Sequence, residues 1–337
     1  MNRDKLIQKF LSANNLANCT LIPINNDASF RKYFRIKDKG LILMDAPSEL
    51  GESIESFIKV DGILLGLDLN VPRILAVEPN DGFLLLEDFG ENVFSKILST
   101  NNEEGLYKKA IEVIAHIQSS NIHPDLNEYS IEELLKESRL FIDWYLIKHK
   151  QIKINPSDIL EFESIISALF QSISPAFDTI VLRDYHVDNL FYLGDIRELT
   201  IMNYRGNLVA PVGLIDFQDA LIGSPSYDLA SLIEDVRRPI GLELKESLLN
   251  HFLLHTDLDY EETEREISFF SVQRNLKILG IFCRLKYRDK KEDYMKYLNN
   301  GIDFLSKHLE DSSMKDLNRW MKKFAPEISP LRINILN

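Results

Sequence analysis

The sequence predicts an α+β fold with two lobes, a small strand-rich lobe followed by a larger helical one. Three observations support this prediction. Short apolar runs separated by polar turns fill the first 90 residues, helical periodicity dominates after Gly90, and 337 residues are enough for two hydrophobic cores. We therefore expect an N-lobe at 1–90 and a C-lobe at 91–337, with a hinge between them.

The N-lobe is expected to contain five strands, with one helix inserted after the third. An amphipathic helix at 4–17 precedes the strands, and Asn80-Asp81-Gly82 forms a hairpin turn before the last one. Alternating or continuous apolar runs bounded by turn residues place the remaining elements. The strands are predicted at 21–24, 33–36, 41–44, 71–77 and 83–86, and the inserted helix at 52–66.

The C-lobe is expected to be mainly helical. Periodicity of 3.6 residues predicts helices at 103–120, 130–149 and around 157–172, and helices resume from about 227 to the C-terminus. A strand-rich insert spans about 179–217. The segment 269–282 is apolar on several sides, which predicts a central helix of this lobe.

Composition excludes several classes of protein. The net charge of −13 and the pI of about 5.1 argue against a nucleic-acid partner, because neutralising phosphates requires a basic surface. Local Arg and Lys groups can still bind an anionic nucleotide. Cys19 and Cys283 form neither a disulfide framework nor a zinc site. The N-terminus lacks a signal-peptide core and no apolar run reaches the roughly 20 residues of a membrane span, so we expect a cytoplasmic protein without a membrane partner.

Two short motifs carry the chemistry. Asp184 and Asn189 have the spacing of a kinase catalytic loop, in which an Asp lies beside the acceptor hydroxyl and an Asn five residues later holds a metal ion. Asp216 ends the apolar run 212–215, the position of a carboxylate that binds magnesium on ATP phosphates. Each motif alone also fits a turn Asp, a solvated Asn or a strand-end Asp. Their order, their separation and the small lobe before them favour the catalytic interpretation.

The motifs and their flanking residues resemble a known group. The chain resembles the aminoglycoside phosphotransferase and choline kinase superfamily, and more closely the bacterial kinases of the cell-wall sugars N-acetylmuramate and N-acetylglucosamine. The matching stretches, which run over nearly the whole chain, are 27–35, 43–47, 85–90, 183–189, 213–220, 223–230 and 273–282.

The resemblance implies a protein-kinase-like bilobal fold, with ATP and Mg2+ as cofactors. By it, Asp184 orients or deprotonates the acceptor hydroxyl, and Asn189 and Asp216 bind magnesium. It also assigns the nucleotide-binding residues. Asp27, Ala28, Ser29, Phe30 and Arg31 would form the turn over the phosphates, and the segment Glu87, Asp88 and Phe89 would be the hinge whose backbone meets the adenine edge.

The chain departs from this pattern at two positions. The lysine that grips ATP phosphates should lie near Met44, which cannot supply charge. Arg31 or Arg35, on one face of the preceding strand by period two, could replace it, or each could be a solvent-facing charge. The usual His-Gly before the catalytic Asp is here Leu182-Arg183, so this position gives no support.

Candidate acceptor residues are expected on the C-lobe. Phe141, Trp144 and Tyr145 share helical spacing where this superfamily often builds its acceptor site, although such an aromatic stripe is more often core. Among the three, Trp144 is our candidate for stacking on the substrate. Asp219 either caps a turn or contacts substrate.

Polar residues inside the apolar segment 269–282 also need partners. Arg274, Asn275 and Lys277 either face the substrate or pair with Asp228 or Glu234, because burying them unpaired is costly. Of these, Arg274 and Asn275 are our substrate candidates. His186, next to the catalytic Asp, is expected to have a structural hydrogen-bonding role.

The expected function is transfer of the ATP γ-phosphoryl group to a small acceptor, by the resemblance the anomeric hydroxyl of an N-acetylated amino sugar. The product, a sugar 1-phosphate, would feed peptidoglycan recycling. The alternatives are another acceptor (an aminoglycoside, choline, homoserine or a different sugar) or a catalytically silent nucleotide-binding module, supported only by Met44. A kinase for proteins is disfavoured because no Ala-Pro-Glu pattern follows Asp216. Oligomeric state stays open.

Overall fold

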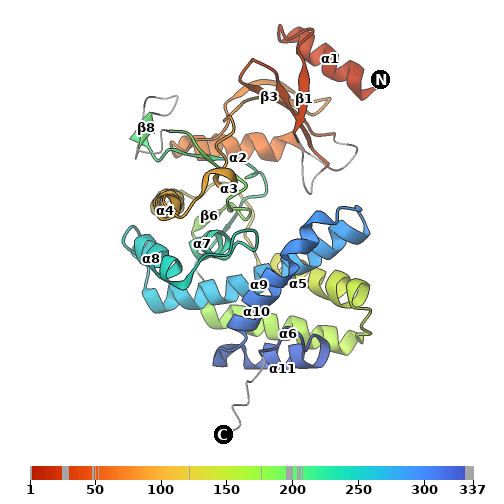
Figure 1. The fold of residues 1–337 in the computed structure, drawn as a ribbon, viewed down its shortest axis with the longest axis vertical. Coiled ribbons are helices and arrows are strands. Elements are labelled where there is room, and N and C mark those ends of the chain that lie inside the picture. The colour runs from red at the N-terminus through yellow and green to blue at the C-terminus, as the bar shows by residue number, and fades with distance from the viewer. Residues whose placement is uncertain are drawn as a thin grey trace. The chain divides into compact units, whose positions relative to one another are not determined.

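The computed structural model of the chain describes residues 2–24, 30–47, 49, 51, 53–120, 122–175, 177–194, 200–202, 206 and 208–330. It contains two compact units (Figure 1). Unit 1 comprises Met1–Val113 and Val187–Ala220, and unit 2 comprises Ile114–His186 and Leu221–Asn337. The expected boundary at residue 90 falls inside unit 1, and a hinge there stays a prediction.

The five strands that the sequence predicts form an antiparallel sheet in unit 1, with strand order β1-β2-β3-β5-β4. One helix, α2, follows the third strand, as expected. The elements of this part of unit 1 are α1 (Arg3–Ala13), β1 (Leu21–Ile24), β2 (Lys32–Ile36), β3 (Leu41–Asp45), α2 (Ile54–Gly66), β4 (Ile74–Glu78) and β5 (Phe83–Glu87).

Helix α1 covers one face of this sheet. Its buried side chains Ile7, Phe10 and Leu11 pack on Leu43 of β3 and Leu85 of β5, which alternation places on the same face. At the edge of this core, Arg3 donates to the buried Asp45 carboxylate at 2.5 Å. Because alternation is strict, Met44, between Leu43 and Asp45, points to the opposite face.

The start of β4 differs from the expected 71–77. The strand begins at Ile74, because Pro72 has no N–H to donate to a ladder. The residues before it serve another purpose. Asn70 accepts the backbone N–H of Leu214 at 2.8 Å, and its side-chain amide donates to the carbonyl of Ala210 at 2.8 Å.

The rest of unit 1 brings two short strands together. β7 (Leu190–Tyr192) pairs antiparallel with β10 (Val212–Leu214), with Leu190 opposite Leu214. Its other elements are α3 (Phe94–Ile97), β8 (Ile201–Met202) and β9 (Leu208–Val209), and α4 (Glu103–Ser119) runs from unit 1 into unit 2.

Unit 2 is built around α9 (Tyr260–Tyr287), which confirms the predicted central helix and buries 15 of its 28 residues. This long helix contacts α5, α6, α7, α10 and η2 (Figure 1). The elements are α5 (Ile131–Leu140), η2 (Phe141–His149), α6 (Pro156–Ile173), β6 (Thr179–Val181), β11 (Leu221–Gly223), α7 (Pro225–Ile233), α8 (Leu242–Leu253), η3 (Asp293–Tyr297), α10 (Leu298–His308), η4 (Ser312–Met314) and α11 (Lys315–Phe324).

The helix expected at 130–149 is α-helical only as far as Leu140 and continues as a π-helix, η2. The buried residues of η2 are Phe141, Ile142, Tyr145 and Leu146. Their spacing of one and four residues fits the wider π turn as well as the α turn, so the sequence alone does not separate the two. Within the described residues, no helix is long and apolar enough to cross a membrane.

Candidate active site

The strand pair β7–β10 holds Asn189 and Asp216 together in unit 1. Asn189 immediately precedes β7, Asp216 lies two residues beyond β10, and the N–H of Ile215 donates to the carbonyl of Asn189 at 3.2 Å. The side-chain amide nitrogen of Asn189 lies 3.5 Å from Oδ2 of Asp216. Two residues 27 positions apart, proposed from the sequence as metal ligands, are therefore neighbours.

Asp216 has an unusual backbone conformation. Its φ is +60°, in the left-handed region that costs a non-glycine residue about 1 kcal/mol and persists only where surroundings hold it. Gln218 supplies part of this support, because its side-chain amide donates to Oδ1 of Asp216 at 3.0 Å and to Oδ2 of Asp219 at 3.2 Å. The exposed Asp219 thus shares a donor with Asp216. Sequence reasoning missed Gln218, for which proximity to Asp216 is the only signal.

The donor set fits a hard cation. A carboxylate and an amide oxygen are ligands that Mg2+ accepts, and both side chains are half-buried, so they keep access to a ligand. Asn189 and Asp216 would hold the ion.

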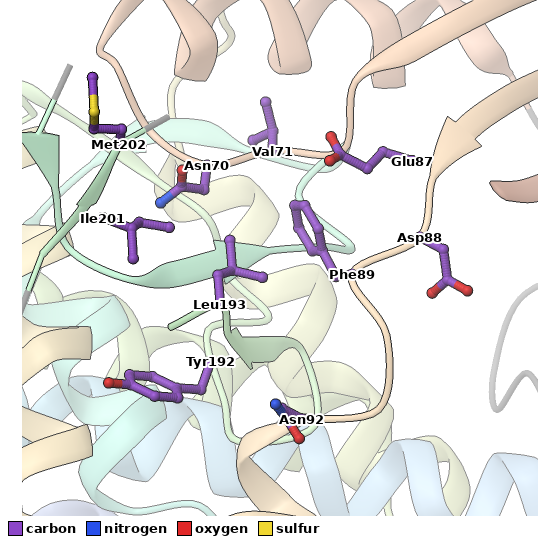
Figure 2. Close-up of a pocket in the computed structure, with 10 residues that line it drawn as sticks. All are labelled: Asn70, Val71, Glu87, Asp88, Phe89, Asn92, Tyr192, Leu193, Ile201 and Met202. Atoms are coloured by element: carbon purple, nitrogen blue, oxygen red, sulfur yellow. The ribbon is translucent and has the colours of Figure 1, made fainter. Parts of the chain in front are cut away.

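The predicted hinge residues border a cavity of about 320 Å³ (Figure 2). This volume is at the lower end of the range for small-molecule sites. Glu87 and Phe89, both assigned to nucleotide binding from the sequence, lie on it. Asp88, the middle residue of the predicted hinge, lines it too. The other lining residues, which the sequence did not single out for a pocket, are Asn70, Val71, Asn92, Tyr192, Leu193, Ile201 and Met202.

The hinge backbone is held at each side of Phe89. The N–H of Glu87 donates to the carbonyl of Arg73, the N–H of Asp88 donates to the carbonyl of Gly40, and Gly90 donates to the Asp88 carboxylate. Among the hydrogen bonds of the described residues, none uses the backbone N–H of Phe89. That group is available to a hydrogen-bond acceptor on a ligand.

The Phe89 side chain is fixed by its neighbours in β7 and β10. Its ring centroid lies 5.9 Å from that of Phe191. A Cβ at Gly213 would come within 2.7 Å of the Phe89 ring, so only glycine leaves room for it there. The ring therefore ties the hinge segment to the strand pair that carries the candidate metal ligands.

The two arginines proposed to replace the lysine have different surroundings. Arg35 donates to both carboxylate oxygens of Asp88, at 2.5 and 3.1 Å, and to the carbonyl of Gly90 at 2.8 Å, and it pairs with Glu91. Arg31 is buried, at 7% exposure, and Met44 is completely buried. Arg35 is thus bound by the predicted hinge segment, and a phosphate-binding role for Arg31, at the end of the predicted phosphate turn, stays a prediction.

Only the end of the predicted phosphate turn lies within the described residues. Asp27, Ala28 and Ser29 lie outside the described residues. Phe30, at its end, is 55% exposed.

The loop that carries Asp184 belongs to unit 2. Asp228, at the first turn of α7, accepts the backbone N–H of Leu182 at 2.6 Å and that of Arg183 at 2.9 Å. Burial raises the pKa of Asp228 to about 7, against the two N–H donors and Arg274, and Asp184 adds to the rise. Asp184 is half-buried.

His186 is buried two residues after Asp184. Burial, followed by the charges of Arg237 and Arg274, holds its pKa well below the usual value. The imidazole is therefore neutral at physiological pH, and its structural hydrogen-bonding role stays a prediction.

The candidate acceptor residues divide into core and accessible groups. Phe141 and Tyr145 are buried and stacked on each other, with ring centroids 5.1 Å apart, so they are core. Trp144 is half-buried.

Arg274 is buried with its guanidinium 5.6 Å from the Tyr227 ring centroid. Asn275 is fully buried, and its side chain donates to the carbonyl of Ser271 at 2.8 Å, as in a structural pairing.

The partner of Lys277 is one that the sequence did not suggest. Instead of Asp228 or Glu234, it pairs with Glu137 of α5 at 2.8 Å. Glu234 receives Lys245 at 2.8 Å and His308 at 2.9 Å. Of the three polar residues, Arg274 alone interacts with one of the two acids that the sequence suggested, because its charge lowers the pKa of Asp228. Lys277 and Glu137 are 140 residues apart in the sequence, so no local pattern predicts their contact.

The sequence is similar to those of known phosphotransferases. The model of a family described as "Phosphotransferase enzyme family" matches residues 20–266. An N-acetylmuramate/N-acetylglucosamine kinase of Pseudomonas aeruginosa is 33% identical over 284 residues, which are 82% of this chain and 79% of that protein.

Solved structures show the same fold at low identity. A choline/ethanolamine kinase family protein from Mesorhizobium loti has a TM-score of 0.63 and 13% identity, covering 96% of this chain and 100% of that one. The GDP complex of an aminoglycoside 2′-phosphotransferase has a TM-score of 0.59 and 14% identity, covering 91% and 98%. The protein-kinase-like fold expected from the sequence is confirmed.

Proposed function

This chain belongs to the phosphotransferase enzyme family and is an ATP-dependent small-molecule kinase, and from that premise we propose that it phosphorylates the anomeric hydroxyl of N-acetylmuramate or N-acetylglucosamine. The observation that carries the choice of acceptor is the 33% identity to a kinase of that name over 82% of the chain. The product would be a sugar 1-phosphate that feeds peptidoglycan recycling.

The proposed chemistry uses Asp184 on the acceptor. Its carboxylate accepts a hydrogen bond from the acceptor hydroxyl and takes the proton as the oxygen bonds to the γ-phosphorus. The bond from that phosphorus to the β–γ bridging oxygen breaks, and ADP leaves. Because phosphoryl transfer involves little covalent work for the protein, alignment of the two substrates supplies much of the rate.

The proposed nucleotide contacts lie in unit 1. The N–H of Phe89, which donates no hydrogen bond among the described residues, supports recognition of the adenine edge, and the 27–31 turn with Arg31 would contact the phosphates. Asn189 and Asp216 would bind Mg2+, which supplies positive charge to the phosphate oxygens. Trp144, Asp219, Arg274 and Asn275 stay proposals for the acceptor side, with Trp144 the most suitable for stacking because it is half-buried.

The test is a panel of acceptors with Mg-ATP, scored by ADP release. N-acetylmuramate and N-acetylglucosamine should be turned over, with the phosphorus on the anomeric oxygen by NMR. The methyl glycoside of N-acetylglucosamine is the matched control, since it keeps the ring and lacks only the reacting hydroxyl. Phosphorylation of that glycoside, or faster turnover of kanamycin, choline or homoserine, would show that the proposed acceptor is wrong.

A further inference from the structure

A buried carboxylate in unit 2 collects four donors from three segments of the chain. Glu137 of α5 is 7% exposed. Its Oε1 receives Lys277 at 2.8 Å and the guanidinium of Arg183, and its Oε2 receives the Tyr129 hydroxyl and the side-chain amide of Gln273 at 3.1 Å. Both oxygens are therefore fully used, and the cluster links α5, α9 and the loop that carries Asp184.

The charges in this cluster explain why it holds together. Burial alone would raise the pKa of Glu137, but Lys277 and then Arg183 outweigh it and lower the pKa to about 2. The carboxylate is thus ionised at neutral pH. It pairs with two cations, Lys277 and Arg183. The charge of Asp184 also contributes to raising the pKa of Lys277. With Asp184 included, two half-buried cations interact with two carboxylates.

Arg183 connects this cluster to the backbone of the catalytic loop. It has a φ of +69°, a conformation that needs external support in a non-glycine residue. The support is double, since Asp228 binds its backbone N–H at 2.9 Å and Glu137 binds its side chain. Asp184 is the next residue along, so its direction depends on how Arg183 is held.

We propose that Glu137 and Lys277 are positioning residues for phosphoryl transfer, because through Arg183 they fix the direction in which the Asp184 carboxylate faces the acceptor. This proposal rests on the function proposed for Asp184 above. It assigns a role to the Arg183 position, where the family pattern of His-Gly is absent.

The first test is Glu137→Gln, which keeps the size of the side chain and removes its charge. Misplacing a reacting group by about 1 Å costs roughly 100-fold in rate, so kcat should fall by about that factor while KM for ATP changes less than about twofold. Glu133→Gln is the matched control, one turn away on α5 and 44% exposed, and should leave kcat unchanged. Adding Lys277→Met to Glu137→Gln removes the surplus cation and should recover part of kcat.

If Glu137→Gln does not fold, Lys277→Met alone is the test, because it removes the cation that holds the Glu137 carboxylate in place for Arg183, and kcat should fall more than twofold. A folded single variant with kcat within twofold of wild type overturns the proposal. So does a loss of Mg-ATP affinity in step with kcat, since that marks a merely structural role.

Hydrogen exchange separates this proposal from the proposed function. The amides of Leu182 and Arg183 should exchange at least tenfold faster in Lys277→Met than in wild type, and this readout needs no acceptor. If the wild type phosphorylates none of the panel but exchange accelerates, the acceptor is wrong and the positioning contact stands. If the wild type is active and exchange is unchanged, the positioning role is wrong.

Discussion

Arg31 and Arg35 lie four residues apart, and their side chains have different surroundings. Arg35 is bound by Asp88, Glu91 and the carbonyl of Gly90, so its charge stabilises the hinge segment. Arg31 is buried beside the predicted phosphate turn, where a cation acts in little water. We therefore expect Arg31 to supply the charge that is missing at Met44.

The first prediction concerns these arginines. Arg31→Ala should raise KM for ATP and lower kcat, so that kcat/KM for ATP falls by roughly 10²-fold. Removing one preorganised hydrogen-bond donor from an active site typically has an effect of this size. Acceptor KM should hardly change. Lys32→Ala, at the exposed neighbouring position, is the control and should be near wild type. Wild-type ATP kinetics for Arg31→Ala would exclude this residue from phosphate binding.

The second prediction separates the two carboxylates of the proposed mechanism. Asp184→Asn should lower kcat by about 10²–10⁴-fold, the usual contribution of a proton-accepting group, and leave Mg-ATP affinity intact. Titration calorimetry with Mg-ATP and steady-state kinetics would measure both effects. Near-normal turnover in a folded variant would remove Asp184 from the reaction.

At the scale of single elements, α2 carries a buried carboxylate without a described partner. Asp61 is 5% exposed, its Oδ1 has no hydrogen-bond partner among the described residues, and burial raises its pKa to about 7. A folded pKa above the unfolded value of 3.8 stabilises the protein at low pH. That stability is lost as pH rises through about 7.

The third prediction follows from that sign. Wild type should lose roughly 2–3 kcal/mol of stability from this group between about pH 5 and pH 9, and Asp61→Asn should lose none of it. Denaturant unfolding of both proteins across this range gives the difference. Parallel pH profiles for the two proteins would show that the carboxyl titrates normally.

The fourth prediction concerns the contact of α9 with the end of α5. A Cβ at Gly280 would lie 2.3 Å from the carbonyl carbon of Leu140, which is backbone and cannot move away cheaply. Gly280→Ala should therefore destabilise unit 2 by about 1–3 kcal/mol. Gly62→Ala in α2 is the control, because nothing lies within 4 Å of that position, and it should stabilise by up to about 1 kcal/mol. If Gly280→Ala and Gly62→Ala changed Tm equally, the close contact between Gly280 and Leu140 would be contradicted.

At the scale of the whole molecule, nucleotide binding should increase the free energy of unfolding. A non-hydrolysable ATP analogue with Mg2+ at about 100 times Kd should stabilise the native chain by about 2.7 kcal/mol. Asp216→Asn should abolish the increment that depends on Mg2+ and leave the unliganded protein folded. The measurement is Tm with and without Mg2+. A magnesium-dependent increment that survives in Asp216→Asn would place the metal elsewhere.

The sequence by itself determined the elements and the two motifs of this protein. Apolar runs between turn residues located the strands of the five-stranded sheet, and helical periodicity found α9, because both patterns are local consequences of burying one face. The spacing of Asp184 and Asn189, and the strand before Asp216, also follow from local order along the chain.

Tertiary structure decided which side chains are partners. The contact of Glu137 with Lys277 spans 140 positions and that of Arg35 with Asp88 spans 53, and no periodicity records such distances. The same is true of Asn70, which joins the start of β4 to β10. Such contacts arise when separate elements share one core, so the sequence predicted which residues needed partners, and only the fold determined which partners they have.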